Sequence, residues 1–386
     1  MTFIDSPLSQ TIALAGGDLH VAVARSDLPL GALCGFASRR NPKRPFLFVS
    51  KVLGRHLPVR PQVMRMVHRR LAAKLPADLP GPVVAIGMAE TAICLGQGVF
   101  EAWRGGSGRE DGLFIHSTRY RLRQGLLSTF EESHSHATSH LIHQPAAAED
   151  RALCAACRTL VLVDDEASTG ATFVALVEAN RQAMPNLAQI VCVTITDWMG
   201  AAKRAEIMAA MPVPTTFVSL LEGGYTFEPR QVTPPAMPNV TGDGAFKDDL
   251  IPVNWGRLGL RRPRPLPAAA LAIRVKAGER VLVLGTGEFV FPPFQLARRL
   301  SAMGADVRVQ ATTRSPILEG GDIDGVIDFA DAYGDGIPNF LYSTRPGDYD
   351  RVLVCYETPP STAQTALIAA LGAEPVFFNA IGDLRT

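Results

Sequence analysis

The chain has 386 residues, 47% of them hydrophobic and 19% charged, which is an ordinary globular composition, and this length favours two domains. Its formal net charge of +1 lacks the basic excess of a general nucleic-acid binder, and no apolar run is long enough to span a membrane. The first residues show no basic segment followed by an apolar one, so we expect no secretory signal and a cytoplasmic protein.

The chain begins with short predicted strands and one helix. Residues 11–25 alternate apolar and polar side chains around two glycines, which predicts a β-hairpin. Residues 36–44 form a basic loop before a predicted strand at 46–50, and this loop is either a solvated surface segment or a site for an anion or a partner. Residues 62–75 place their apolar side chains on one face, which predicts an amphipathic helix.

Strands and helices alternate through the rest of the first half. This alternation predicts an α/β fold with a doubly wound parallel sheet. Residues 221–264 are rich in glycine, proline and polar residues, so we place a domain boundary there and divide the chain into residues 1–240 and 241–386. The predicted strands are 83–86, 113–117, 160–163 and 190–195, and the predicted helices are 92–103 and 173–180.

The second part of the chain predicts a smaller α/β domain with the same order of strands, turns and helices as the first. Its strand at 281–284 runs into a glycine turn at 285–288, and an arginine-containing turn follows at 312–314. The first half shows the same order at 87–90 and 117–119. Two interpretations remain open: the second domain is a diverged copy that has lost a pair of aspartates, or the similarity is the common rhythm of α/β units.

Residues 160–172 are the most informative segment. Four apolar β-formers lead into Asp164 and Asp165, and a predicted helix begins at Phe173. The carboxyl end of such a strand is where open α/β sheets bind ligands. Carboxylates suit sugar hydroxyls and Mg²⁺, whereas the free N–H groups and hydroxyls of the following turn suit a phosphate. The segment therefore predicts a ribose 5-phosphate site built from Asp164, Asp165, Glu166, Ala167, Ser168, Thr169, Gly170, Ala171 and Thr172.

A second turn earlier in the chain has the features of an anion site. Gly87, Met88, Ala89, Glu90 and Thr91 follow the predicted strand at 83–86. Glycine permits close approach of the backbone to a ligand, and the N–H groups of such a turn suit an anion.

Residues 117–143 combine acids and histidines in an unusual density. Half of the eight histidines lie between positions 134 and 143, next to two adjacent acids. These groups can serve as acid and base, can ligate a metal, or can belong to a solvated loop; we favour catalysis over a dedicated metal site. The candidates are Glu131, Glu132, His134 and His136.

The strand-Asp-Asp segment resembles the ribose-phosphate motif of type I phosphoribosyltransferases, with Ala171 where that family usually has a second glycine. Residues 41–56, 117–120 and 131–137 resemble one subfamily, the orotate-phosphoribosyltransferase-like proteins of tellurite-resistance-associated bacterial gene clusters. The C-terminal domain of that subfamily is named for a Thr-Arg-Ser-Pro signature, and residues 313–316 have this sequence. The resemblance covers nearly the whole chain.

The resemblance implies a type I phosphoribosyltransferase fold followed by a second, smaller α/β domain. It implies a homodimeric enzyme that uses phosphoribosyl diphosphate and Mg²⁺ to make or break an N-ribosidic bond with a base-like acceptor, in the synthesis of a nucleotide-like metabolite. Asp164 and Asp165 would hold the ribose and Mg²⁺, and residues 166–172 would hold the 5-phosphate. The diphosphate would face Arg119, Lys51 and residues 87–91, and the acids and histidines at 131–136 would close over the site.

Two alternatives differ in the role of the domains. The protein could be a sensor that binds a phosphoribosyl ligand without turnover, or the second domain could be an independent enzyme gated by the first. For the second domain we expect the turns at 285–288 and 313–316 to converge on a separate anion pocket, with Arg314 as its cation; the alternative is that Arg314 pairs with a structural acid.

Overall fold

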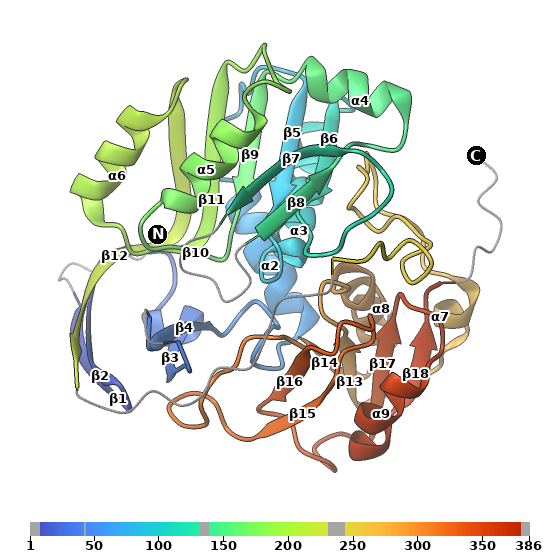
Figure 1. The fold of residues 1–386 in the computed structure, drawn as a ribbon. Helices are drawn as coiled ribbons and strands as arrows, with labels where there is room; N and C mark the ends of the chain where they lie inside the picture. Colours follow the sequence, from blue (N-terminus) through green and yellow to red (C-terminus); the bar gives the residue numbers. More distant parts are fainter. Residues whose placement is uncertain (1–7, 42–43, 132–138, 231–243, 380–386) are drawn as a thin grey trace.

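A computed structural model describes residues 8–41, 44–131, 139–230 and 244–379. The first domain contains an eight-stranded sheet in the order β1-β2-β12-β11-β9-β5-β6, with β10 beside β11 (Figure 1). The strands are β1 (Leu8–Leu14), β2 (Gly17–Ser26), β3 (Cys34–Ser38), β4 (Phe46–Ser50), β5 (Val83–Gly87), β6 (Gly112–His116), β7 (Leu126–Glu131), β8 (Ser139–His143), β9 (Thr159–Val163), β10 (Glu166–Ala167), β11 (Gln189–Asp197) and β12 (Thr215–Pro229). The helices are α1 (Leu30–Leu33), α2 (Pro61–Ala72), α3 (Ile93–Ser107), α4 (Ala148–Ala155), α5 (Ala171–Asn180) and α6 (Gly200–Ala210).

The second domain has a four-stranded sheet in the order β14-β13-β17-β18, in which all neighbours are parallel. Its strands are β13 (Arg280–Gly285), β14 (Asp306–Ala311), β15 (Val326–Ala330), β16 (Pro338–Tyr342), β17 (Arg351–Tyr356) and β18 (Glu374–Phe377). Its helices are α7 (Ala268–Ala272), α8 (Phe291–Ala302), the 3₁₀ helix η1 (Thr362–Gln364) and α9 (Thr365–Leu371). None of the helices in the described ranges combines the length and apolar character needed to cross a bilayer.

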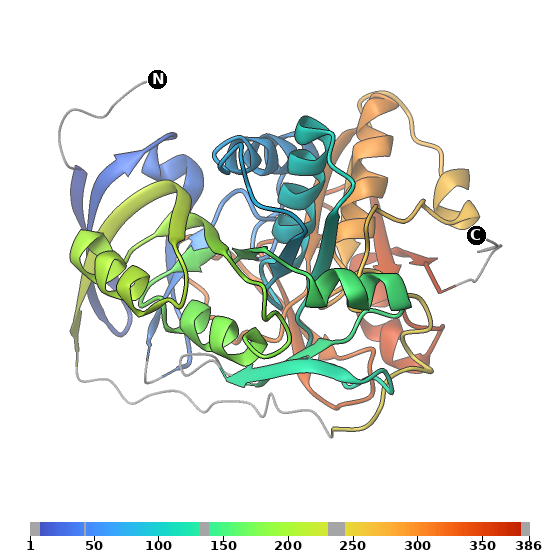
Figure 2. The same ribbon diagram turned by 90° about the horizontal axis from the view of Figure 1, so that it is seen from above.

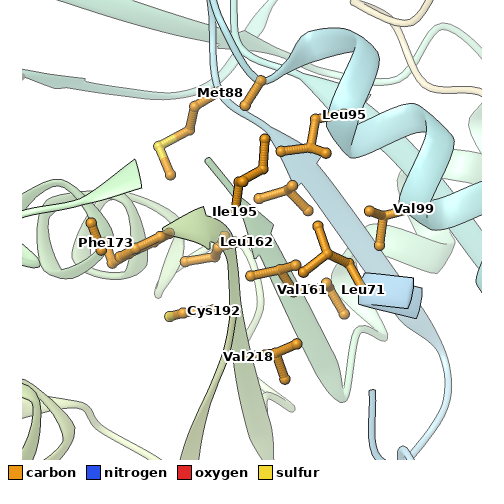
Figure 3. Packing of buried hydrophobic residues seen from close by; sticks show 14 of the residues in the cluster. Leu71, Met88, Leu95, Val99, Val161, Leu162, Phe173, Cys192, Ile195 and Val218 are labelled. Carbon is orange, nitrogen blue, oxygen red and sulfur yellow. The ribbon is translucent and has the colours of Figure 1, made fainter. Parts of the chain in front are cut away.

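The central strands of the first sheet are buried on both faces. Every residue of β5, β6 and β9 is buried, because helices cover both sides of a parallel sheet. Alternate residues of β9 face opposite sides: Val161 packs with Leu71 and Val99 of α2 and α3, and Leu162 lies toward Phe173 of α5 (Figure 3). The predicted α/β fold class and the parallel sheet are confirmed.

The structure also corrects two sequence predictions. Residues 221–229 are not boundary loop but the second half of β12, which pairs with β2 and has a bulge at Glu222 and Gly223. Residues 126–143 are not only loop, because β7 and β8 form an antiparallel hairpin. The division of the chain at residue 240 stays a prediction.

The two domains share one strand order. The order β14-β13-β17-β18 repeats β6-β5-β9-β11, and an antiparallel hairpin, β7–β8 or β15–β16, lies between the second and third parallel strands in each. Since β5 and β13 pair alike with their neighbours, strand register matches Asp165 with Glu357 and Asp164 with Tyr356. Both aspartates are lost as predicted, but Glu357 keeps one carboxylate at the position of Asp165, which corrects the prediction that no carboxylate of the pair remains. The shared strand order fits both a diverged copy and the common pattern of α/β units.

Helices α2, α3 and α8 lie side by side where the domains meet (Figure 2). The apolar core of the second domain extends across this boundary to include Val59 and Met64 of the first. A polar contact adds to it: the buried guanidinium of Arg55 donates to the carbonyl oxygens of Gly287 and Thr312, each at 2.7 Å. The domains thus form one packed unit.

Buried histidines give the folded state a specific acid sensitivity. Burial lowers the pKa of His56 and His68 to about 3 and that of His116 to about 4, from 6.5. Below pH 6.5 the unfolded chain binds protons that the folded chain does not, so stability is lost as pH falls. We expect each histidine to contribute a slope of up to about 1.4 kcal/mol per pH unit between pH 6.5 and 4. Urea unfolding should give a shallower pH dependence for His68→Phe; an unchanged slope would contradict this.

Candidate functional site

A cavity of about 150 Å³ lies at the carboxyl ends of β5 and β9, where it meets the second domain. Segments that are far apart in the chain form its walls. The lining residues are Arg39, Arg44, Leu47, His56, Met88, Ala89, Glu90, Thr91, Arg119, His140, Asp164, Asp165, Glu166, Ala167, Ser168, Thr169, Gly170, Thr172, Phe173, Thr313, Arg314 and Ser315.

The two aspartates leave the end of β9 half-buried, facing the turn that follows β5. The Asp164 carboxylate accepts a hydrogen bond from the N–H of Asp165 at 2.9 Å. The Asp165 carboxylate accepts one from the hydroxyl of Thr91 at 2.8 Å. This bond joins the two loops that the sequence predicted to form one site. Carboxylate oxygens of this kind can accept hydrogen bonds from sugar hydroxyls or bind a hard cation.

The turn before α5 depends on one glycine. Gly170 has φ of +74°, and a Cβ there would lie 2.8 Å from Ile207 and 2.9 Å from the Met199 sulfur. Ala171, the first residue of α5, is not among the residues of positive φ. The missing second glycine is therefore no obstacle, and the N–H groups at the start of α5 remain suited to an anion.

A partly buried ion pair lines the cavity. The guanidinium of Arg44 lies 2.5 Å from the Glu166 carboxylate and stacks over the rings of Phe46 and Phe48. Burial raises the pKa of Glu166, while the charge of Arg44 lowers it. Glu166 thus has an arginine as its partner in the cavity wall, and its contact with a ligand stays a prediction.

The turn after β5 is held from the neighbouring strand. The Ser117 hydroxyl accepts a hydrogen bond from the Ala89 N–H at 2.9 Å and lies 3.0 Å from Nδ1 of His140. The His140 ring stacks on Phe130 with ring centroids 4.4 Å apart. Arg119 donates to the Ser139 carbonyl at 2.7 Å and lines the cavity. The hairpin β7–β8 thereby positions the wall near Glu90.

The structure does not place the Thr-Arg-Ser-Pro turn in a separate pocket. Thr313, Arg314 and Ser315 line the same cavity as the aspartates. Gly287 lines a different cavity of only about 10 Å³, room for at most one water molecule. The predicted anion pocket within the second domain is therefore wrong, because this turn faces the first domain.

Several predicted site residues lie elsewhere. Lys51 forms an ion pair with Asp322 at 2.6 Å, outside the cavity lining. Glu131 is exposed at the end of β7, where its carboxylate accepts a hydrogen bond from Ser139. Gly87 and Ala171 support their turns without lining the cavity. Glu132, His134 and His136 lie outside the described residues, and the described part of the chain contains no cluster of three potential metal-ligating side chains.

The sequence prediction missed part of the wall. Arg39 and Arg44 come from the basic segment, Leu47 from β4, His56 from the loop between β4 and α2, and His140 from β8. The high density of cations in residues 36–44 is the sequence feature that points to this part of the wall. The same feature is equally typical of a solvated loop.

Two family models match the chain. A phosphoribosyl transferase model matches residues 33–224, and a model of the TRSP domain that lies C-terminal to it matches residues 256–371. No curated protein matches the chain.

Among solved structures, adenine phosphoribosyltransferase from Giardia lamblia is 17% identical, with a TM-score of 0.34 over 49% of this chain and 94% of that one. Adenine phosphoribosyl transferase from Trypanosoma brucei is 14% identical, with a TM-score of 0.35 over 51% of this chain and 82% of that one. Hypoxanthine phosphoribosyltransferase from Staphylococcus aureus is 15% identical, with a TM-score of 0.25 over 38% and 70%. Likenesses this distant say nothing of the substrate.

The turn geometry makes a testable statement about Gly170. Gly170→Ala should destabilise the fold by about 1–3 kcal/mol, because alanine must adopt a left-handed conformation and its Cβ meets Ile207. Ala171→Gly is the matched control and should cost below about 1 kcal/mol. Urea unfolding of both variants measures the difference; equal losses would show that the turn does not require Gly170.

Proposed function

Because the chain belongs to the phosphoribosyl transferase family with a C-terminal TRSP domain, we propose that it uses phosphoribosyl diphosphate and Mg²⁺ to make or break an N-ribosidic bond. The observation that carries the proposal is the hydrogen bond from Thr91 to Asp165, which brings the two predicted ligand loops together on one cavity. The acceptor would be a base-like small molecule, and the product a nucleotide-like metabolite.

Each part of the cavity suits one part of phosphoribosyl diphosphate. The hydroxyls of Ser168, Thr169 and Thr172, with the N–H groups at the start of α5, suit the 5-phosphate. Asp164 and Asp165 suit the ribose hydroxyls. The turn at residues 87–91 and Arg119 suit the diphosphate.

The chemistry such a site must promote is cleavage at the anomeric carbon through a cationic sugar state. The aspartates orient the ribose and lie where positive charge develops on the ring, so their charge favours that state over the ground state. Arg119 would neutralise the departing diphosphate. Asp164 and Asp165 would hold the Mg²⁺ ion, since carboxylates are the ligands that this ion prefers, and the ion would add charge neutralisation for the departing group.

His56 marks where a polar group of the acceptor could bind. Its imidazole lines the cavity and stays neutral at pH 7, because burial holds its pKa at about 3. In the described part of the chain its Nε2 has no hydrogen-bond partner. A ligand group that exchanges a hydrogen bond with Nε2 would satisfy this buried atom.

Some expectations remain predictions. Glu132, His134 and His136 belong to the segment that would close over the site, and Lys51 could reach the diphosphate only by leaving Asp322. The homodimer is also a prediction. Incubation with phosphoribosyl diphosphate, Mg²⁺ and candidate acceptors tests turnover: release of diphosphate supports an enzyme, and tight binding without release would identify a sensor instead.

Asp164→Asn with Asp165→Asn preserves shape and removes the negative charge on the sugar side. We expect the affinity for phosphoribosyl diphosphate in Mg²⁺ to fall by one to two orders of magnitude, at about 1.4 kcal/mol per tenfold. Isothermal titration calorimetry measures this loss. Glu178→Gln on the outer side of α5 is the control, with unchanged affinity expected; unaltered affinity in the folded double variant would refute the assignment.

A further inference from the structure

The turn that follows β5 contacts the second domain, and the turn that follows β13 contacts the first. The Glu288 carboxylate of the second domain accepts a hydrogen bond from the Arg119 N–H at 2.6 Å. The Glu90 carboxylate of the first domain lies 3.4 Å from Nε of Arg314 and accepts a hydrogen bond from the Thr313 hydroxyl at 3.4 Å. Each domain therefore places a glutamate against the Thr-Arg turn of the other, as two copies related by a twofold axis would.

The position in the second domain that corresponds to the cavity is filled by the chain itself. Arg257 donates to Glu357, the counterpart of Asp165, at 2.7 and 2.8 Å and to Glu288 at 3.0 Å, and all three side chains are buried. The Tyr333 hydroxyl donates to the same Glu357 carboxylate at 2.7 Å. No space for a sugar phosphate remains at this position of the second domain. Of the two corresponding positions, only the one in the first domain is open within the described residues.

Arg314 faces the site that stays open. The residue is buried, 7% exposed, and its guanidinium donates to the Tyr120 hydroxyl at 3.1 Å. Across the described ranges, neither Nε of Arg314 nor Oε1 of Glu90 has a hydrogen-bond partner, although the two groups lie close enough for an ion pair. An unsatisfied buried donor costs about 1–3 kcal/mol, which a ligand oxygen accepting from this N–H would offset.

We infer that the second domain completes the phosphoribosyl site of the first, with Arg314 binding the diphosphate end of the ligand from across the domain interface. This inference rests on the proposed function, in which the loop that contains Glu90 faces the diphosphate. A guanidinium presents planar, permanently charged donors that match phosphate oxygens. When the ligand binds, Arg314 leaves its ion pair with Glu90 and contacts the diphosphate oxygens instead. Ser315 lines the same wall of the cavity.

Two substitutions should move diphosphate affinity in opposite directions. Arg314→Gln removes the binding charge, so the affinity of the full chain for inorganic diphosphate in Mg²⁺ should fall by about tenfold or more. Glu90→Gln removes the competing carboxylate and leaves Arg314 in place, so the same affinity should rise. Ribose 5-phosphate, which would use the turn at residues 168–172, should bind both variants within about twofold of the wild-type chain.

A purely structural ion pair predicts a different pattern, in which both substitutions weaken diphosphate and ribose 5-phosphate alike; that pattern would overturn the inference. Arg60→Gln is the control, because it removes an interdomain ion pair with Asp306 away from the cavity and should leave both affinities unchanged. If Arg314→Gln fails to fold, Arg314→Lys, which should bind diphosphate less tightly than wild type, and Glu90→Gln supply the test.

The outcomes for the two proposals are separable. In one outcome the wild-type chain binds diphosphate through Arg314 without releasing diphosphate from phosphoribosyl diphosphate. That result contradicts the proposed reaction and supports the composite site, in which Arg314 of the second domain completes the site of the first. Turnover that is unaffected by Arg314→Gln, with unchanged diphosphate affinity, contradicts the composite site alone. Absence of diphosphate binding by the wild-type chain would also overturn it.

Discussion

The guanidinium of Arg55 is the contact on which the arrangement of the two domains depends. It is buried, and besides two carbonyl oxygens of the second domain it donates to the carbonyl oxygen of Glu90. One side chain therefore fixes the turn after β5 of the first domain against the turns after β13 and β14. Carbonyl groups buried at a domain boundary must find donors, and a five-donor side chain satisfies three of them together.

This constraint explains why the functional groups gather at one place. Parallel strands deliver their carboxyl ends to one edge of a sheet, and here the edges of two such sheets meet. The cavity brings Asp164 and Asp165 at the end of β9 together with Arg119 and Arg314 near the turn after β5. Such an arrangement suits a ligand that has polar hydroxyls in its middle and an anionic group at each end.

The sequence predicted the parts of the site that depend on local geometry. An apolar strand followed by Asp164 and Asp165 can only present those carboxylates at a sheet edge, and the turn at residues 87–91 follows from the same rule. It did not predict β12, because Gly223 and Gly224 lower strand propensity and pairing with β2 overrides that preference. The contact between Glu90 and Arg314 joins residues from different domains, and no local pattern encodes such a pairing.

The buried cluster of Arg257, Glu288 and Glu357 is found in only one of the two covalently linked domains, an asymmetry that identical subunits cannot have. In an association of two identical subunits, one gene encodes both halves, so a substitution that closes one ligand site closes the other. A tandem chain is free of that restriction, and each half accumulates its own changes. One half can retain the aspartates and its cavity. In the other half an internal arginine can fill the corresponding cavity, while the surface that contacts the first half is kept. In this chain the filled position belongs to the second domain, where Arg257 occupies it, and the open cavity belongs to the first.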